Sequence, residues 1–278
     1  MDAVLKLKDL EDTTQQRLMN TLNKFCDDHP LSTHCYAIYY LTYEPRRTEL
    51  LLMTSGSDIR SYALVWYGGK FTIQDIYEVH IWNPISDLVS RINIPPRKRV
   101  DIQLYNSTPN DIEMVKKHFK ALGFRRFSIE EFHDMICDRE SFNPSPLEKL
   151  AIKLGEEHAL LYRDLELERG IEISVDEARE ILEEYTHYGI IIDNVLASIA
   201  AKYVTLPRIH VIGGVFTRRR YRGRGYAKAV TSALTRDAIA SGAIAGLHVE
   251  VSNKLAIKIY RSLGYKVIRT KTWIFAYP

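Results

Sequence analysis

Hydrophobic and polar positions in the second half of the chain change several times between the spacing of strands and the spacing of helices. Short apolar runs bounded by turn residues predict strands at 150–154, 190–192, 195–203, 209–217, 246–251, 266–269 and 272–277. Apolar positions with helical spacing predict helices at 156–165, 174–185, about 225–240, and a last one that ends before Gly264. Strands separated by crossover helices indicate a mixed α/β sheet.

Local signals support three of these elements. Ser174–Glu177 has the pattern of a capping box, which begins a helix. Asp193-Asn194 lies between two strand-like runs and predicts a hairpin turn. The pair Gly213-Gly214 interrupts the strand at 209–217, which indicates a β-bulge or a close approach of another group to the backbone.

The first half of the chain has a similar outline. Strand-like runs lie at 34–41, 49–54, 60–66, 71–81 and 99–104, and a helix is predicted at 112–122. Gly123 follows that helix and precedes an aromatic residue that enters a strand, as Gly264 does in the second half. We interpret the repeated order as an internal duplication, although two ordinary helix–strand joints would give the same local pattern.

Length and composition favour two domains. The chain has 278 residues, and about 150 residues per domain is a usual length. Hydrophobic residues make up 46% and charged residues 26%, which is enough apolar material for packed cores. The segment 142–146 contains two prolines, which neither a helix nor a central strand accommodates, and it predicts the linker. The expected domains are residues 1–143 and residues 144–278.

The formal charge of +3 is unevenly distributed. Residues 1–143 contain 18 basic and 20 acidic side chains, whereas residues 144–278 contain 20 and 15. Five of the basic residues in the second half lie between Arg218 and Arg224. Such a balance excludes a protein coated for nucleic acid along its whole length, and it places the excess in one short segment.

The three cysteines are Cys26, Cys35 and Cys137, which are odd in number and widely spaced. They match neither a disulfide framework nor a zinc-binding spacing, so we expect a reducing compartment and no bound metal. No run reaches the ~18–20 apolar residues of a membrane span, and the first ten residues lack the apolar core of a signal peptide. The expectation is a soluble cytoplasmic protein.

The segment 215–227 joins a predicted strand to a predicted helix and contains Gly223, Gly225 and five arginines. The glycines allow backbone N–H groups to face one point, and the helix start adds more N–H groups and a positive dipole end. The arginines add charge-assisted hydrogen bonds. These features predict a phosphate site, in particular a pyrophosphate site. Taken as charge alone, the arginines equally fit a solvated surface, a nucleic-acid patch or a targeting signal.

Two motifs in the second half resemble signatures of the GNAT superfamily of N-acetyltransferases. Arg220, Gly223 and Gly225 match the Arg/Gln-x-x-Gly-x-Gly/Ala signature of that superfamily. Asn253 and Tyr260 match a second signature, in which an Asn opens a helix and a Tyr follows two turns later. The resemblance covers about residues 147–278. It implies an α/β (α+β) fold, with a mixed, mostly antiparallel twisted sheet flanked by helices.

The resemblance also implies that acetyl-CoA binds where the fourth and fifth strands of the domain separate. Backbone groups of 215–217 would pair with the pantetheine arm, and N–H groups of 222–228 would bind the pyrophosphate. The implied cofactor-binding residues are Val215, Phe216, Thr217, Arg220, Arg222, Gly223, Arg224, Gly225, Tyr226, Ala227, Lys228 and Asn253. For Asn253 the alternative is a plain helix N-cap.

The implied reaction is direct attack of a primary amine on the thioester. A backbone N–H near Val215 would stabilise the oxyanion. Tyr260 would protonate the leaving thiolate, unless it is only a core aromatic. The base varies within the superfamily, so His210 and Glu250, on the fourth and fifth strands, are both candidates, and an unassisted route through water stays open.

The first half resembles the same fold without its phosphate loop. The equivalent segment, 81–87, has neither Gly-x-Gly nor a basic cluster, and Asp87 would repel phosphate. We expect tandem GNAT-like domains, of which the first is degenerate, does not bind CoA and helps to shape the acceptor pocket, loosely as in glycine N-acyltransferase-like proteins. Four aromatic residues either line that pocket or belong to the core: Trp66, Tyr67, Tyr77 and Trp82.

The predicted function is therefore transfer of an acetyl group from acetyl-CoA to a primary amine. Two alternatives are a CoA-sensing module without catalysis and a nucleic-acid-binding protein that uses the arginine segment. The presence of Tyr260 argues against the first alternative. Crowding of the basic residues into one loop, without stacking aromatics spread over a face, argues against the second. We expect no membrane or nucleic-acid partner, and the acceptor amine, the acyl length and the oligomeric state stay open.

Overall fold

The computed structural model describes residues 4–55, 58–68 and 76–278. Contacts divide the chain into two units: the first runs to Phe132 and also includes Thr270–Pro278, and the second is His133–Arg269. The expected boundary after residue 143 thus lies inside the second unit. The reason is that the proline-containing segment packs there, since the Ser145 N–H donates a 2.9 Å hydrogen bond to Ser232 Oγ.

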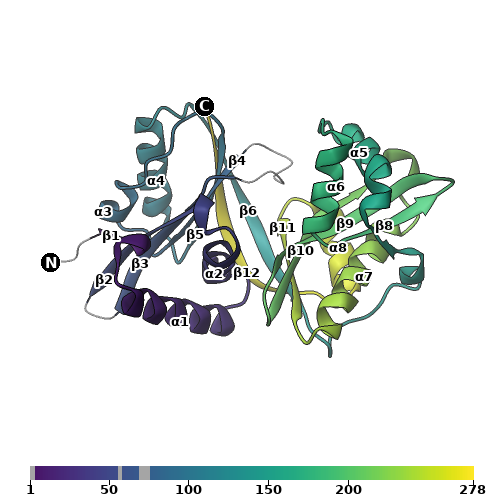
Figure 1. The fold of residues 1–278 in the computed structure, drawn as a ribbon, viewed down its shortest axis with the longest axis horizontal. Helices are drawn as coiled ribbons and strands as arrows, with labels where there is room; N and C mark the ends of the chain where they lie inside the picture. Colours follow the sequence, from purple (N-terminus) through teal and green to yellow (C-terminus); the bar gives the residue numbers. More distant parts are fainter. Residues whose placement is uncertain (1–3, 56–57, 69–75) are drawn as a thin grey trace. The chain divides into compact units, whose positions relative to one another are not determined.

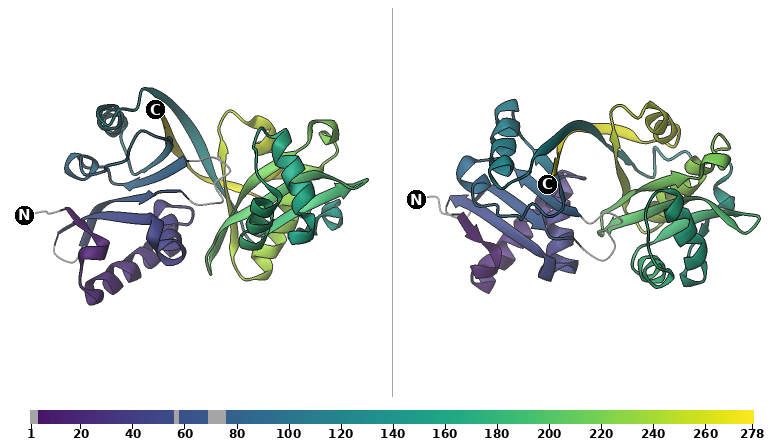
Figure 2. Two further views of the ribbon diagram at one scale, coloured as in Figure 1. Left: turned by 45° about the horizontal axis from the view of Figure 1, so that its top comes forward. Right: turned by 90° about the horizontal axis from the view of Figure 1, so that it is seen from above.

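Unit 1 is one sheet with helices on both faces. Its elements are β1 (Val4–Lys6), α1 (Asp12–Asp28), α2 (Thr33–Tyr43), β2 (Thr48–Ser55), β3 (Asp58–Trp66), β4 (Ile76–Trp82), α3 (Ser86–Val89), β5 (Arg99–Tyr105), α4 (Pro109–Ala121), the first part of β6 (Arg126–Cys137) and the last part of β12 (Lys266–Tyr277). The strand order is β1-β2-β3-β4-β5-β12. The helices α1 and α2 cover one face and α3 and α4 cover the other, as Figures 1 and 2 show from three directions.

Unit 2 repeats this order of elements. They are β7 (Ile152–Lys153), α5 (Ala159–Glu168), α6 (Val175–Glu184), β8 (His187–Ile192), β9 (Val195–Thr205), β10 (Ile209–Thr217), α7 (Tyr226–Ala240), β11 (Ile244–Glu250) and α8 (Lys254–Ser262), followed by the first part of β12. The strand order is β6-β11-β10-β9-β8-β7. The strands β10 and β11 pair in parallel, whereas β10 with β9, β9 with β8 and β8 with β7 are antiparallel. The mixed, mostly antiparallel sheet flanked by helices is confirmed in both halves.

The two units also end their last helices in the same way. Gly123 after α4 has φ +103° and Gly264 after α8 has φ +99°, so both helices end in the left-handed conformation that favours glycine. The next residue then donates back to the helix, from Phe124 N to Phe119 O and from Tyr265 N to Tyr260 O. Together with the shared order of elements, this detail supports the internal duplication.

Two predictions of secondary structure are wrong. Residues 34–41 belong to the helix α2, not to a strand, because a short apolar run has no period that separates a buried helix from a buried strand. The two final strands are one continuous strand, β12. The strand predicted at 71–81 is described only from Ile76 onward, and residues 71–75 lie outside the described residues.

The expectation of three unpaired cysteines is also wrong. Cys26, near the end of α1, forms a disulfide with Cys35, at the start of α2, and their Cα atoms are 4.8 Å apart. A sharp turn that includes Leu31 at φ +60° reverses the chain between the two helices and brings the cysteines together. Cys137 is a free, buried thiol. Within the described residues, no helix is both long and apolar enough to cross a membrane.

We expect alkylation of the denatured protein without reductant to label one cysteine per chain, Cys137, and labelling after reduction to modify all three. Mass spectrometry of the intact protein measures this. The Cys137→Ser variant is the control and should take no label without reductant. Because the cross-link closes a short loop, Cys35→Ser should lower the free energy of unfolding by about 2–3 kcal/mol. Labelling of three cysteines before reduction would contradict the pairing.

Candidate active site

The parallel strands β10 and β11 of unit 2 separate after a short paired segment. They pair only at Ile209–Val211 with Ile244–Gly246, while β10 continues to Thr217 and β11 to Glu250. Beyond these pairs the facing backbone groups of the two strands are open to another partner. A gap between parallel strands offers an extended ligand the hydrogen bonds of a missing strand.

A bulge in β10 lies at the point where the strands separate. The register with β9 shifts between Gly213 and Phe216, and Gly214 has φ +55°. A Cβ atom on Gly213 would lie 2.4 Å from the ring of Tyr203, so a side chain there would have to displace that exposed ring. The predicted interruption of the strand is confirmed as a bulge, packed beneath Tyr203 of β9.

The bulge changes which face of the sheet the later residues of β10 occupy. Ile212 belongs to the core formed with α7 and α8, and so does Val215, three positions further on, instead of the even spacing of a regular strand. Phe216 therefore faces the side of α5, where the guanidinium of Arg169 lies 5.4 Å from its ring centroid. The segment 215–217 thus follows the bulge with its backbone beside the opening.

The loop after β10 leads directly into α7. Gly223 and Gly225 have φ +78° and +80°, and no atom of the described residues lies within 4 Å of a Cβ placed on Gly223. Gly225 is the N-cap of α7, and among the described residues no side chain caps the first turn of that helix. The N–H groups of Tyr226, Ala227 and Lys228 are therefore at a helix start with a positive dipole end, as the phosphate-site prediction requires.

The arginines of the loop are partly engaged by the protein itself. Arg218 donates to Glu168 at 2.7 Å and to the Leu196 carbonyl at 2.8 Å. Arg222 Nε donates to the carbonyl of Thr217 at 3.2 Å. Arg220 and Arg224 lie over the ring of the buried Tyr221, at 4.7 and 5.6 Å from its centroid. These contacts fix the shape of the loop, in which the N–H groups of Arg219, Tyr221 and Arg222 also have internal acceptors.

Arg218 and Arg220 also line a hollow of about 320 Å³ together with Asp164 and Glu168 of α5. The two carboxylates oppose the two guanidinium groups, so this hollow has no excess of positive charge.

Tyr260 lies on α8, in the core that α7 and α8 form on their side of the sheet. It is 8% exposed, and burial raises the pKa of its hydroxyl to about 12, so the group keeps its proton at neutral pH. Asn253 is the N-cap of α8, and its Oδ1 accepts a 3.1 Å hydrogen bond from the Ala256 N–H. Asn253 therefore caps the helix, which is the alternative to a contact with CoA.

His210, one of the candidate bases, precedes the bulge and shares the face of Ile212. It therefore lies on the side of α7, beside the ion pair of Lys202 and Asp237. Asp237 is about 18 Å along α7 from Gly225, at 1.5 Å per residue. Burial, followed by the positive charge of Lys202, lowers the pKa of His210 to about 4. The structure thus separates this histidine from the loop.

Glu250 ends β11 as predicted and lies on the face opposite the α7–α8 core, because Leu247 and Val249 belong to that core. The same alternation places His248 on the face of Glu250, and sequence reasoning missed this residue. His248 Nδ1 lies 2.7 Å from Oδ1 of Asp134, whose side chain is fully buried on β6. The two residues belong to no common sequence motif. They meet because β6 lies next to β11 in the sheet.

Unit 1 is closed at the equivalent position. Its parallel strands β4 and β5 pair without interruption from Ile76–Arg99 to Trp82–Tyr105. Counted from the first pair in each unit, His80 takes the place of Gly213, and Gln103 takes the place of His248. The equivalent of α7 is the four-residue helix α3. These features support the prediction that unit 1 does not bind CoA.

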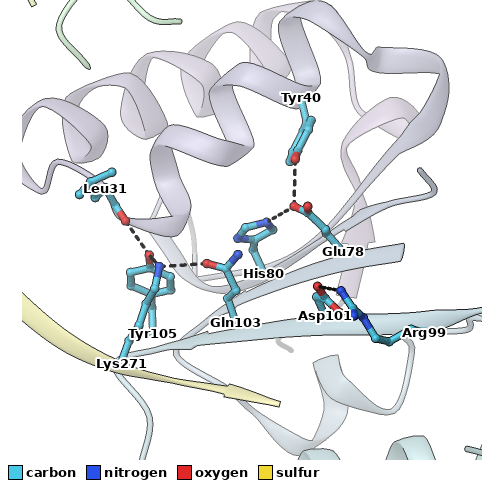
Figure 3. Close-up of polar contacts among 9 residues, drawn as sticks. All are labelled: Leu31, Tyr40, Glu78, His80, Arg99, Asp101, Gln103, Tyr105 and Lys271. Atoms are coloured by element: carbon cyan, nitrogen blue, oxygen red, sulfur yellow. Dashed lines mark hydrogen bonds and ion pairs between the residues drawn. The ribbon is translucent and has the colours of Figure 1, made fainter. Parts of the chain in front are cut away.

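A polar cluster occupies this closed position beneath α2, and Figure 3 shows its members on the strands. His80 Nε2 lies 3.2 Å from Glu78, which also accepts a 2.9 Å hydrogen bond from Tyr40. Lys271 donates to Gln103 at 2.9 Å and to the Tyr105 hydroxyl. Arg99 forms a bidentate pair with Asp101, although burial still raises the pKa of that carboxyl to about 6.

The four aromatic residues considered for the acceptor pocket have partners within unit 1. Trp66 is 3% exposed and stacks on Tyr40 with 4.9 Å between centroids. Tyr77 belongs to the core with α4, and the Tyr67 hydroxyl donates to Glu49. Trp82 packs against His34 with 5.3 Å between centroids. These contacts favour the core interpretation.

Among the described residues, no group of three or more potential ligands could hold a metal ion. Residues 187–274 match the family model described as FR47-like protein. Comparison with curated protein sequences gives no significant match.

Solved structures resemble the whole chain. A Drosophila protein superposes with a TM-score of 0.73 at 12% identity, over 100% of this chain and 99% of its own. A GCN5-related N-acetyltransferase-like protein from Streptococcus suis gives 0.60 at 16% identity, over 95% and 99%. A tandem GNAT protein from the clavulanic acid biosynthesis pathway gives 0.58 at 15% identity, over 99% and 98%. The chain therefore has the tandem GNAT fold expected from the two motifs of the second half together with the similar outline of the first half.

Proposed function

We propose that unit 2 transfers an acetyl or other short acyl group from a CoA thioester to a primary amine. The observation that carries this proposal is the coincidence of three features at one place. The strands β10 and β11 separate, a glycine-containing loop follows β10, and that loop ends at the uncapped start of α7. CoA has an extended pantetheine arm joined to a pyrophosphate. The arm would bind in the gap between the strands, and the pyrophosphate would bind at the loop and helix start that follow.

The residues present fit a CoA thioester in shape and charge. The backbone of Val215 and the Thr217 N–H would pair with the pantetheine arm, whereas the Thr217 carbonyl already accepts from Arg222. The bulge at Gly214 turns the adjacent N–H groups out of the regular ladder. The open space at Gly223 lets a phosphate approach the backbone closely. An N–H near Val215 would then stabilise the oxyanion that develops on the thioester carbonyl.

Tyr260 is the proposed acid. Its high pKa keeps the phenol protonated at neutral pH, so a proton is present when the thiolate begins to leave. Its position on the α8 side complements an acceptor that approaches from the α5 side, where Phe216 and Glu250 face. Acid and acceptor would thus reach the thioester from opposite faces of the sheet.

A nucleic-acid role for the arginine segment has less support. Arg218 is bound to Glu168 and Arg222 to a backbone carbonyl, and the guanidinium groups of Arg220 and Arg224 stack on Tyr221. A phosphate backbone would have to compete with these internal contacts. A sensor without catalysis would have no use for the retained acid at Tyr260.

Substitution of Gly225 by Glu should weaken CoA binding at least about 100-fold, because the new carboxylate would stand where the α7 dipole favours an anion. Isothermal titration with CoA measures the affinity. Gly242→Glu is the matched control, since Gly242 has a similar φ of +86°, open surroundings, and lies past the far end of α7. Equal affinity in the two variants would exclude the proposed phosphate site.

Tyr260→Phe should lower kcat on the order of 10²-fold while leaving acetyl-CoA affinity nearly unchanged, because the variant removes a proton donor but keeps the ring in its core position. Steady-state release of free CoA, with acetyl-CoA and an accepted amine, gives kcat. Full activity of the variant would remove Tyr260 as the acid.

Calorimetric titration of the intact chain should give one CoA per chain, because β10 and β11 open whereas β4 and β5 are paired throughout. The Gly225→Glu variant provides the control and should lose the whole binding signal. A stoichiometry near two, or a residual site in that variant, would mean that unit 1 also binds CoA.

A further inference from the structure

His248 lies beside the opening between β10 and β11. It is two residues beyond Gly246, the last residue of β11 that pairs with β10, and its side chain shares the face of Gly246. On that face β10 presents Gly213 at the bulge, covered by Tyr203 of β9, and then Phe216. Under the proposed acyl transfer, an amine that reaches the thioester from the α5 side would pass the imidazole.

The carboxylate of Asp134 orients this imidazole. Asp134 is fully buried on β6, the strand next to β11, and its Oδ1 lies 2.7 Å from His248 Nδ1. Because an ionised carboxylate only accepts hydrogen bonds, Nδ1 must be the donor. In the neutral imidazole the single proton is then on Nδ1, and Nε2 has the lone pair that a base requires.

The charges around the pair are balanced. Arg269 of β12 lies 3.7 Å from Oδ2 of Asp134, so the carboxylate is shared between one cation and the imidazole. Two more ionisable side chains lie on this side of the sheet. Glu250 shares the face of His248 on β11, and Tyr203 of β9 covers the bulge of β10. A negative charge beside an imidazole favours its protonated form, so the pair is suited to accept a proton and release it again.

We propose that His248 is the base that deprotonates the acceptor amine, with Asp134 as its positioning residue. This inference rests on the proposed acyl transfer. His248 replaces the two bases expected from the sequence. His210 faces α7 on the other side of the sheet, and Glu250 ends the strand, where it accepts a hydrogen bond from Ser252.

The proton balance of the step is as follows. The acceptor ammonium gives one proton to Nε2 of His248, directly or through a water molecule, and the freed nitrogen lone pair forms the bond to the thioester carbonyl carbon. The C–S bond breaks, and its electron pair leaves on sulfur. Tyr260 protonates that sulfur and regains its proton from the new amide nitrogen. His248 then releases its proton to solvent, so the products are a neutral amide, free CoA and one proton.

A screen of amino acids, polyamines and lysine peptides for release of free CoA first identifies an accepted amine. The test then compares pH–rate profiles of the full chain with acetyl-CoA and that amine. In the wild-type protein kcat/KM should fall at acidic pH as His248 becomes protonated. His248→Gln should lower kcat on the order of 10²-fold, move this acidic limb up to the pKa of the acceptor ammonium itself and leave CoA affinity unchanged. Asp134→Asn should move the limb to lower pH, because loss of the carboxylate destabilises the imidazolium.

Glu250→Gln and His210→Gln are the rival variants, and each should keep the acidic limb at its wild-type position. An acidic limb that keeps its wild-type position in His248→Gln, or that moves to the pKa of the acceptor ammonium in either rival variant, overturns the inference. Calorimetric CoA affinity and thermal unfolding of each variant show that the fold is retained. If Asp134→Asn does not fold, His248→Gln and the rival variants still decide the outcome.

The tautomer of His248 gives a readout that does not depend on turnover. In ¹⁵N NMR spectra of the full chain above the pKa of His248, we expect the proton on Nδ1 and an unprotonated Nε2, and His248→Gln assigns the signal. A proton on Nε2 would overturn the inference. If CoA does not bind or no amine is acylated, the proposed function fails instead, and the NMR result still shows separately whether the imidazole is poised as a base.

Discussion

The separation of β10 from β11 is the constraint on which the rest of the site depends. Backbone N–H and C=O groups in the middle of a sheet need partners, and leaving them unpaired in a buried position costs about 1–3 kcal/mol per group. Unit 1 meets this requirement within the protein, by pairing β4 with β5 along seven positions. Unit 2 pairs only three positions, and the two strands separate beyond them. The same order of elements thus gives a closed sheet in one unit and an opening between parallel strands in the other.

The one-residue bulge at Gly213-Gly214 determines which side chains reach that slot. Without the bulge, His210 and Phe216 would share a face, six positions apart on a regular strand. With it, His210 packs beside Lys202 and Asp237, while Phe216 faces the opposite side. The bulge itself favours glycine, because Gly214 has φ +55°, a left-handed conformation that other residues rarely adopt. A local backbone feature therefore decides the chemistry available at the centre of the sheet.

Local pattern predicted most of the fold and the loop, because capping residues, strand alternation and glycine spacing act over a few residues. It identified the helix start after Gly225 and the bulge in β10. It failed where distant segments decide the outcome. Asp134 and His248 are 114 positions apart and meet only because β6 and β11 are neighbours in the sheet. The helix at 34–41 and the disulfide between Cys26 and Cys35 likewise depend on how α1 and α2 pack.

The course of β12 explains why the linker-like segment is not the boundary between the units. The last part of β12 pairs with β5 from Trp273–Gln103 to Ala276–Val100, and Lys271 donates to Gln103 and Tyr105 beneath α2. A chain cut after residue 143 would leave β5 as an exposed edge and would remove the buried ammonium from those two side chains. Unit 1 therefore completes its sheet only with the final residues of the chain, and prolines at 144 and 146 mark a turn inside unit 2, not a point of division.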